Sequence, residues 1–325
     1  MYHTHPCIQK IETPVLTREQ SAPGVALTFN AGAAKWKGRY VMLSRNDYGD
    51  YKTQEIRPAV TDLRVAFSDD GLHWEMEPEP ILEELKSEEI IRAYDPRITI
   101  IENRAYICFA VDTHHGVRGG IAATDDFKHF EVLSLSVPDN RNMVLFPEKI
   151  NGYYTRLERP MPVDGRSWLT PGQDVWLSQS PDLKFWGNSQ LVLTKEQVSF
   201  ATKKIGPAAP PIKTEKGWLT LFHAVAENTA YQPLVGWDKK GNLIYYAGVM
   251  LLDLNHPTHI IGRYDKPLLV PETRWETVEG FRNHVIFPGG LVPEPDGSVK
   301  IYYGAGDAVE CMATAKIDDL LQLCL

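Results

Sequence analysis

The sequence lacks the long apolar runs and the paired cysteines that mark several large classes of protein. No window holds the roughly 18 apolar residues that a membrane-spanning helix needs. The opening stretch MYHTHPCIQKIETPVL has neither a basic nor an apolar segment, so it does not read as a secretory signal peptide. The four cysteines, at positions 7, 108, 311 and 324, form no CxxC pair, which favours free thiols over a disulfide framework. We therefore expect a cytoplasmic protein without a membrane anchor.

The chain is also poor in clustered positive charge and in cofactor signatures. Its formal net charge is −8, whereas nucleic-acid affinity comes from clustered Lys and Arg, so no nucleic-acid partner is expected. The segments HTH (3–5) and THH (113–115) have no second cluster at zinc spacing. No GxSxG motif, P-loop or dinucleotide fingerprint is present. We expect neither a metal nor an organic cofactor, although a few local basic residues can still bind a small anion.

Helical periodicity is scarce as well. Only 80–93 (PILEELKSEEIIRA) and 316–324 (KIDDLLQLC) show a helical pattern. Elsewhere, short runs of Val, Ile, Tyr, Phe and Trp alternate with turn residues. This pattern is typical of an all-β protein.

Two repeats run along the chain. FSDDGLHWE (67–75), ATDDFKHFE (123–131) and QSPDLKFWG (179–187) share a hydroxyl residue, an acidic turn and an aromatic residue, and their hydroxyl residues Ser68, Thr124 and Ser180 are 56 positions apart each time. In the second repeat, a tight-turn residue is followed by a predicted strand, and a short polar or proline-containing segment lies upstream. It recurs five times, at 38–45, 103–110, 151–158, 216–224 and 297–305.

Five such units, each with an inner strand, a turn, a second strand and outer strands, predict a five-bladed β-propeller. Blades of roughly 40 to 50 residues are usual, so five with their loops would use the whole chain. A large β-sandwich also fits the pattern, but the regular spacing favours the propeller. We expect one catalytic domain over 1–325, with the first 25 or so residues and the C-terminal helix at its periphery. The inner strands would line an axial pocket.

Polar residues gather beside the predicted inner strands. Singly, each has an ordinary explanation: an Asp before Pro suits a turn, and an Arg at a strand end usually makes a weak surface ion pair. Because they recur at equivalent blade ends, we expect them to converge on one axis. Cations outnumber acids among them, which predicts an anion site.

The same segments, read together, resemble glycoside hydrolase family 130. The resemblance rests on FNAGA, AYDPR, NRNMVLFPEKINGYY, RLERP, KIGPAAPPIKTEKGWLTLFHAV, YYAGVMLLDL, VIFPGG and IYYGAGD, which follow in this order from about residue 28 to 318. The family is a five-bladed propeller family composed mostly of inverting β-mannoside phosphorylases. The resemblance implies that the substrates are a β-mannoside and inorganic phosphate, and that the product is α-mannose 1-phosphate.

The resemblance also implies roles for single residues. Asp95 would be the general acid, passing its proton through the 3-hydroxyl of mannose to the glycosidic oxygen. Inverting hydrolysis needs a second carboxylate to activate water, but phosphate is already an anionic nucleophile. Arg97 would orient its neighbours rather than touch substrate. The implied mannose-binding residues are Asn30, Arg45, Tyr94 and Asp307, and the implied phosphate-binding residues are Arg141, Asn142, Arg159, Lys204, His223 and Tyr245.

Several alternatives stay open. A β-1,4-linked manno-oligosaccharide or mannosyl-N-acetylglucosamine is the preferred substrate, with β-1,2-mannobiose and mannosyl-glucose as further candidates. The long loop 224–244, with Tyr231 and Trp237, would bear on the acceptor sugar. A β-mannoside hydrolase or a non-enzymatic sugar-binding propeller are the competing functions; Glu148 and Glu158 are the acids relevant to hydrolysis. The sequence leaves the oligomeric state open between a monomer and a homo-oligomer.

Overall fold

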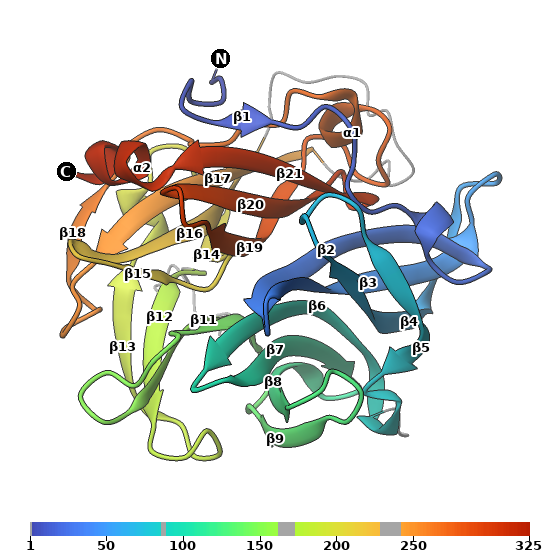
Figure 1. Cartoon of the computed structure of the whole chain (residues 1–325), viewed down its shortest axis with the longest axis horizontal. Helices are drawn as coiled ribbons and strands as arrows, with labels where there is room; N and C mark the ends of the chain where they lie inside the picture. Colours follow the sequence, from blue (N-terminus) through green and yellow to red (C-terminus); the bar gives the residue numbers. More distant parts are fainter. Residues whose placement is uncertain (1, 86–88, 162–172, 228–241) are drawn as a thin grey trace, which may run out of the picture.

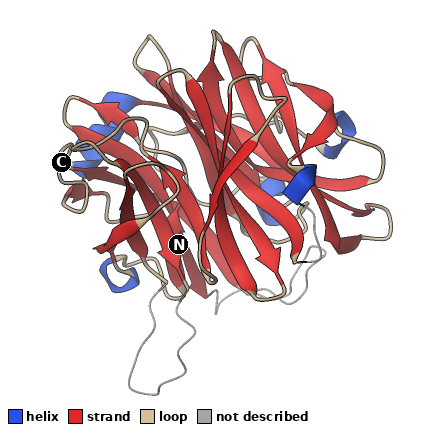
Figure 2. Ribbon diagram, turned by 90° about the horizontal axis from the view of Figure 1, so that it is seen from below, coloured by secondary structure: helices blue, strands red, loops and turns tan. Residues whose placement is uncertain are grey.

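Five antiparallel sheets are arranged around a central axis (Figure 1). The computed structural model describes residues 2–85, 89–161, 173–227 and 242–325. Strands make up most of the molecule, and the few helices lie at its edges (Figure 2). The predicted five-bladed β-propeller is confirmed, and the sandwich is excluded.

The first three blades follow the chain in order. Blade 1 contains β2 (Val25–Trp36), β3 (Arg39–Asp50), β4 (Glu55–Ser68) and β5 (Glu75–Ile81). Blade 2 contains β6 (Ile90–Ile101), β7 (Arg104–Thr113), β8 (Gly116–Thr124) and β9 (Glu131–Leu135). Blade 3 contains β10 (Asn140–Leu145), β11 (Tyr154–Pro160), β12 (Val175–Ser180) and β13 (Gly187–Leu193).

The last two blades complete the ring. Blade 4 contains β14 (Lys204–Pro207) and β15 (Ile212–Thr214), which both pair with β16 (Gly217–Glu227), followed by β17 (Leu243–Leu252) and β18 (Ile260–Arg263). Blade 5 contains β19 (Ile286–Pro293), β20 (Ser298–Ala305) and β21 (Val309–Lys316). Its outermost strand is β1 (Gln9–Lys10), which pairs with β21. The start of the chain therefore contributes to the blade formed by its end.

Both sequence repeats correspond to fixed places in a blade. The five-fold repeat gives the second strands β3, β7, β11, β16 and β20. The three-fold repeat gives the turn between the third and fourth strands of blades 1 to 3. In blade 1, Ser68 Oγ accepts the backbone N–H of Gly71, and Asp70 Oδ1 accepts those of Leu72 and His73. Side-chain oxygens thus satisfy the turn's backbone donors, which is why hydroxyl and acidic residues recur there.

The helices are short, and one of the two predicted helices is absent. The C-terminal prediction is confirmed by α2 (Ile317–Cys324), whose Leu320, Leu321 and Cys324 are buried. The helix predicted over 80–93 is wrong for the described part of that stretch: residues 80–85 end β5 and form the 3₁₀ turn η2 (Glu83–Leu85), and residues 89–93 enter β6. Pairing of β6 with β7 outweighs the local helix preference there. The other helices in the described ranges are α1 (Arg274–Thr277) and the 3₁₀ turns η1 (Arg18–Gln20) and η3 (Lys195–Gln197).

The hydrophobic core lies between neighbouring blades rather than in one central mass. Between blades 1 and 2, for example, Val41, Leu63 and Val65 belong to the same buried cluster as Ile98 and Ile107. This packing leaves the axis to the inner strands and their polar residues. No helix in the described segments is long and apolar enough to cross a membrane.

Candidate active site

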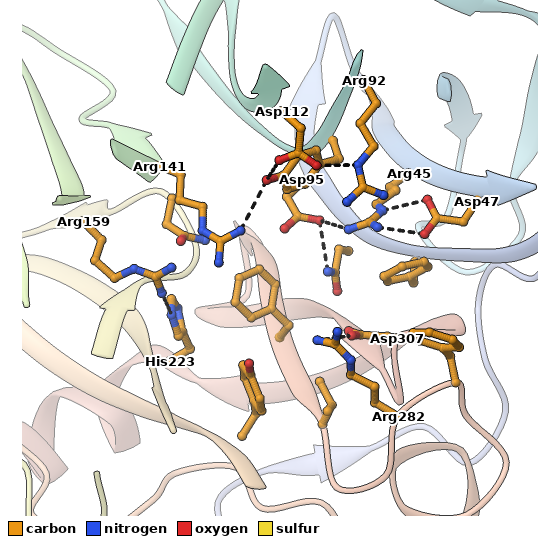
Figure 3. Close-up of a pocket in the computed structure, with 18 of the residues that line it drawn as sticks. Arg45, Asp47, Arg92, Asp95, Asp112, Arg141, Arg159, His223, Arg282 and Asp307 are labelled. Atoms are coloured by element: carbon orange, nitrogen blue, oxygen red, sulfur yellow. Dashed lines mark hydrogen bonds and ion pairs between the residues drawn. The ribbon is translucent and has the colours of Figure 1, made fainter. Parts of the chain in front are cut away.

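A cavity of about 260 Å³ lies where the inner strands converge, and all five blades contribute to its lining (Figure 3). Every residue that the resemblance assigned to proton donation, mannose binding or phosphate binding lies on it. They are Asn30, Arg45, Tyr94, Asp95, Arg141, Asn142, Arg159, Lys204, His223, Tyr245 and Asp307. The structure thus brings the predicted residues together, while their individual roles stay predictions.

A repeated β-bulge places three of these side chains. The pairing of the inner strand shifts between Phe29 and Gly32 in blade 1, between Tyr94 and Arg97 in blade 2, and between Arg141 and Val144 in blade 3. The residue at each bulge has positive φ: 52° at Asn30, 52° at Asp95 and 57° at Asn142. Asn and Asp tolerate this left-handed conformation better than other side chains with a Cβ. The bulge explains why short polar residues stand within otherwise apolar strands.

Asp95 is held by two neighbours from blade 1. Its Oδ1 accepts hydrogen bonds from Asn30 Nδ2 at 3.1 Å and from Arg45 Nη1 at 3.2 Å. Arg45 is itself fixed by Asp47, whose Oδ2 lies 2.7 Å from Nη2. Burial opposes ionisation of Asp95, but the charges of Arg45 and Arg97 outweigh it and hold the pKa of Asp95 below its ordinary value.

Tyr94 connects two charged groups at the cavity wall. Its hydroxyl donates to Asp112 Oδ1 at 2.7 Å and accepts from Arg141 Nη1 at 3.3 Å. Arg92 Nε donates to the other oxygen of Asp112, also at 2.7 Å. Burial raises the pKa of Tyr94 to about 12, so its hydroxyl keeps its proton at neutral pH.

The cavity lining contains a cluster of three cations, Arg141, Arg159 and Lys204. Arg159 is 1% exposed, and its pKa is lowered to about 9 by burial and by the charge of Arg141. Burial and the same two arginines lower the pKa of Lys204 to about 7. Within the described chain, the buried Nε atoms of Arg141 and Arg159 have no hydrogen-bond acceptor. Crowded cations with unsatisfied donors are what an anion-binding site requires.

His223 is fully buried behind this cluster. Its Nδ1 lies 3.1 Å from the carbonyl oxygen of Pro207, which can only accept, and its Nε2 lies 2.8 Å from Arg159 Nη1, which can only donate. The ring is therefore neutral, with its proton on Nδ1. Burial and the neighbouring cations lower its pKa well below the ordinary value. In this geometry the imidazole orients Arg159.

Asp307 and Tyr245 complete the predicted set. Asp307 follows β20 with φ of 50°, and its carboxylate lies 3.5 Å from Arg282 Nη1. Burial raises the pKa of Asp307 above its ordinary value. Tyr245 lies on β17, with its ring centroid 5.5 Å from Lys204 Nζ.

Sequence reasoning missed part of the lining. Arg92 and Asp112 face each other across β6 and β7, and Arg92 alternates with Tyr94 along one strand, as Asp47 does with Arg45. Period-two alternation was the available signal. The missed lining residues are Phe29, Asp47, Arg92, Asp112, Phe281, Arg282, Val285 and Phe287.

The acids relevant to hydrolysis lie elsewhere. Glu158 is buried against Arg156 at 2.7 Å and accepts from Asn140 at 2.9 Å, while Glu148 pairs with Lys213 at 2.6 Å. Neither lines the cavity. Tyr231 and Trp237 of the predicted acceptor loop lie outside the described residues. In the described segments, no group of three or more His, Cys, Asp or Glu is arranged to hold a metal ion.

Comparisons with known proteins identify the family of this chain. A family model for glycoside hydrolase family 130, described as beta-1,4-mannooligosaccharide phosphorylase, matches residues 2–325. A beta-1,4-mannooligosaccharide phosphorylase of Ruminococcus albus is 32% identical over 95% of this chain and 88% of its own. A beta-1,2-mannobiose phosphorylase of Listeria innocua is 31% identical over 80% of this chain and 67% of its own. A solved beta-1,2-mannobiose phosphorylase from Listeria innocua, in complex with beta-1,2-mannobiose, superposes with a TM-score of 0.82 at 26% identity, covering 98% of this chain and 99% of that one. This chain belongs to glycoside hydrolase family 130.

Proposed function

We propose that the protein catalyses inverting phosphorolysis of a β-mannoside, giving α-mannose 1-phosphate and a shortened acceptor. The observation that carries the proposal is the charge of the cavity. Six basic side chains line it (Arg45, Arg92, Arg141, Arg159, Lys204 and Arg282) against four carboxylates (Asp47, Asp95, Asp112 and Asp307), and His223 is neutral. In the free protein, with Lys204 protonated and Asp95 ionised, six against four leaves two positive charges, which attract a phosphate dianion.

In the proposed reaction, one bond forms and one breaks at C1 of the mannosyl unit. Phosphate, held by Arg141, Asn142, Arg159 and Lys204, attacks C1 from the face opposite the acceptor, which inverts the anomeric centre. The C1–O bond to the acceptor breaks as Asp95 gives its proton, through the mannose 3-hydroxyl, to the departing oxygen. Phosphate needs no base to activate it, whereas water would. All four carboxylates of the cavity pair with an arginine, Asp47 and Asp95 with Arg45, Asp112 with Arg92, and Asp307 with Arg282. Ion pairing therefore does not single out Asp95, and its assignment as the acid follows the family resemblance.

A general acid must carry a proton, yet the free protein favours ionised Asp95. Both substrates reverse this preference. A phosphate dianion offsets the charge of Arg141, and a bound sugar displaces water from the carboxyl; each raises the pKa of Asp95. The acid would thus be protonated when the site is filled.

The acceptor and linkage belong to the same proposal. A β-1,4-linked manno-oligosaccharide or mannosyl-N-acetylglucosamine is our first choice. The family model and the Ruminococcus albus relative support the manno-oligosaccharide. Relatives named for β-1,2-mannobiose and for mannosyl-glucose keep those substrates as candidates. Since the cavity's excess charge is matched by phosphate, a neutral acceptor sugar fits better than an anionic one. We propose a cytoplasmic location because a sugar phosphate conserves the energy of the glycosidic bond only inside the cell.

Synthesis in the reverse direction tests the proposal and assigns the acceptor. The protein is incubated with α-mannose 1-phosphate and, separately, mannose, N-acetylglucosamine, glucose or mannobiose, and released phosphate is measured. We expect release with at least one acceptor, with the linkage read from the product by NMR. If none of the acceptors gives phosphate release, the proposal is contradicted.

A further inference from the structure

The axis of the propeller has a hollow at each end. Between the two hollows it is closed by a narrow section, here called the waist, formed around Gly32, Arg97 and Gly289. The inner strands that line the active-site cavity continue into a second hollow of about 280 Å³. Along β2 the lining passes from Asn30 to Ala33, and along β6 it passes from Asp95 to Ile98. The residues between these points form the floor of the active-site cavity.

Backbone contacts between blades make this waist narrow. A Cβ on Gly32 would lie 2.8 Å from the carbonyl oxygen of Pro96, and one on Gly289 would overlap the carbonyl oxygen of Ala31. Real Cβ atoms do not come so close, so only glycine lets the backbones of blades 1, 2 and 5 meet here. One large side chain, Arg97, occupies the space that remains.

Arg97 joins four blades and does not line the active-site cavity. Its Nε donates to the carbonyl of Ala208 in blade 4 at 2.6 Å. Its Nη1 donates to the carbonyls of Pro96 in blade 2 at 2.7 Å and of Asn30 in blade 1 at 3.3 Å. Its guanidinium carbon lies 5.0 Å from the ring centroid of Phe287 in blade 5. It is 3% exposed, and within the described chain it forms no ion pair.

We propose that Arg97 is a positioning residue for the reaction, closing the cavity floor and holding the Asp95 bulge with its carboxyl aimed at the sugar. The proposal rests on the proposed phosphorolysis. The two residues whose carbonyls accept from Arg97 Nη1 are both next to Asp95: Pro96 follows Asp95 directly in the chain, and Asn30 donates a hydrogen bond to the carboxyl of Asp95. Any shift of the guanidinium therefore moves both contacts of the bulge.

The buried charge of Arg97 also acts on Asp95. A buried cation without a carboxylate partner is costly, and an apolar side chain would fill a waist at lower cost. The positive charge of Arg97 is one of the influences that lower the pKa of Asp95. The other charged or polar groups near that carboxyl are Arg45, Asn30, Tyr94, Arg141, Arg159, Asp307 and Glu310. Glu310 accepts the backbone N–H of Ala31 at 3.0 Å, and burial raises its pKa to about 8.

Two substitutions separate the effect of the hydrogen bonds of Arg97 from the effect of its positive charge. Arg97→Met removes the charge at similar length. Arg97→Lys keeps the charge but places all its donors on one nitrogen, so it cannot reach the carbonyls that Nε and Nη1 hold from two separate positions. We expect both to lower kcat by about 100-fold, as misplacing a reacting group does, with the phosphate KM nearly unchanged. In Arg97→Met alone, the fall of kcat at high pH should move upward by about one pH unit, because losing a cation raises the pKa of Asp95. Arg156→Met, which also removes a buried arginine but away from the cavity, is the control for stability.

The expected result for the control is a lower Tm and an unchanged kcat per folded molecule. A folded Arg97 variant with the kcat and the pH dependence of the wild type would overturn the proposal. If Arg97→Met does not fold, the kcat of Arg97→Lys provides the test. Carboxyl ¹³C NMR of the free protein follows the Asp95 titration without turnover, assigned against Asp95→Asn. If the pKa of Asp95 is the same in Arg97→Met as in the wild type, the electrostatic part of the proposal is overturned, whether or not the wild type catalyses phosphorolysis. A wild type without phosphorolysis would count against the proposed function alone.

Discussion

Arg159 and His223 form a buried pair in which the guanidinium donates to a neutral imidazole at 2.8 Å. The imidazole is fixed in turn by the carbonyl of Pro207. This arrangement keeps Arg159 extended toward the cavity while leaving its Nε without an acceptor among the described residues. It is a cation prepared in advance for an anion, which limits the reorganisation that binding requires.

Arg159→Ala should raise the phosphate KM by about 100-fold, since a charge-assisted hydrogen bond in a buried site contributes about 1.5–3 kcal/mol. The mannoside KM should change little. His223→Ala should have a smaller effect in the same direction, because Arg159 remains but loses its orientation. Lys213→Ala, which removes a basic residue from the opposite hollow, is the control. Initial rates over a phosphate series check this, and an unchanged phosphate KM in Arg159→Ala would refute its role.

Asp95→Asn should abolish turnover while preserving sugar binding. The amide is nearly isosteric but has no acidic proton, and general acid catalysis contributes about 10² to 10⁴ in rate. Single-turnover assays and calorimetry with a mannoside measure the two properties. Turnover within tenfold of wild type would mean that another group is the acid. A sugar-binding protein without catalysis would show the same binding and no turnover in the wild type.

Phosphate binding should weaken as the pH rises from 6 to 8. The pKa of Lys204 is about 7 in the free protein, so its charge is present below that pH and lost above it. Phosphate itself becomes more dianionic over the same range, which acts in the opposite direction; the KM should therefore be expressed per dianion. Lys204→Arg keeps a cation at all these pH values and should flatten the profile. Identical profiles for the two proteins would rule out the titration of Lys204.

Gly289→Ala should destabilise the fold strongly, because its Cβ would overlap the carbonyl of Ala31 at the waist. Overpacking against backbone costs about 3 kcal/mol at the upper end of the usual range. Gly187→Ala is the matched control: it lies in β13, is exposed, and its Cβ would meet nothing within 4 Å. Urea unfolding of both variants measures the difference. Equal free energies of unfolding would show that the blades do not meet closely at Gly289.

Asp70→Ala should lower Tm by roughly 2 °C at pH 7. The backbone N–H of His73, the His73 side chain and the N–H of Leu72 hold the pKa of Asp70 below its ordinary value of 3.8. A depressed pKa stabilises the folded protein above the unfolded-state value, and this contribution is lost as the pH falls through the folded-state value. The Tm difference should therefore shrink in acid. Asp69→Ala, in the same turn but paired with Arg39 alone among the described residues, should change Tm less at both pH values.

The fold could be predicted because turns and second strands carry local signals. Each second strand begins after a tight turn, and the Ser/Asp turns recur because their side chains satisfy backbone donors locally. The helix expected over 80–93 was wrong because its apolar residues pack between blades 1 and 2. Such packing is a property of the ring and not of the segment.

The site could be predicted only where its residues belong to recognisable motifs. Asp95 and Asn30 stand out as polar residues within apolar strands, but the left-handed bulges that aim them depend on strand register. Arg92 and Asp112 meet only because β6 and β7 pair in one register. The neutral state of His223 follows from two partners far away in sequence, at positions 159 and 207. Each of these relationships depends on how separate segments of the chain pack together, so no single stretch of sequence predicts it.

The central claim is tested most directly by an NMR time course. The protein is incubated with β-1,4-mannobiose, mannosyl-N-acetylglucosamine, β-1,2-mannobiose or mannosyl-glucose, each with and without inorganic phosphate, and ¹H and ³¹P spectra are followed. We predict that α-mannose 1-phosphate is the first product from at least one of them and forms only when phosphate is present. Free mannose appearing equally fast without phosphate would show a hydrolase, and a β-phosphate product or no turnover of any substrate would likewise contradict inverting phosphorolysis.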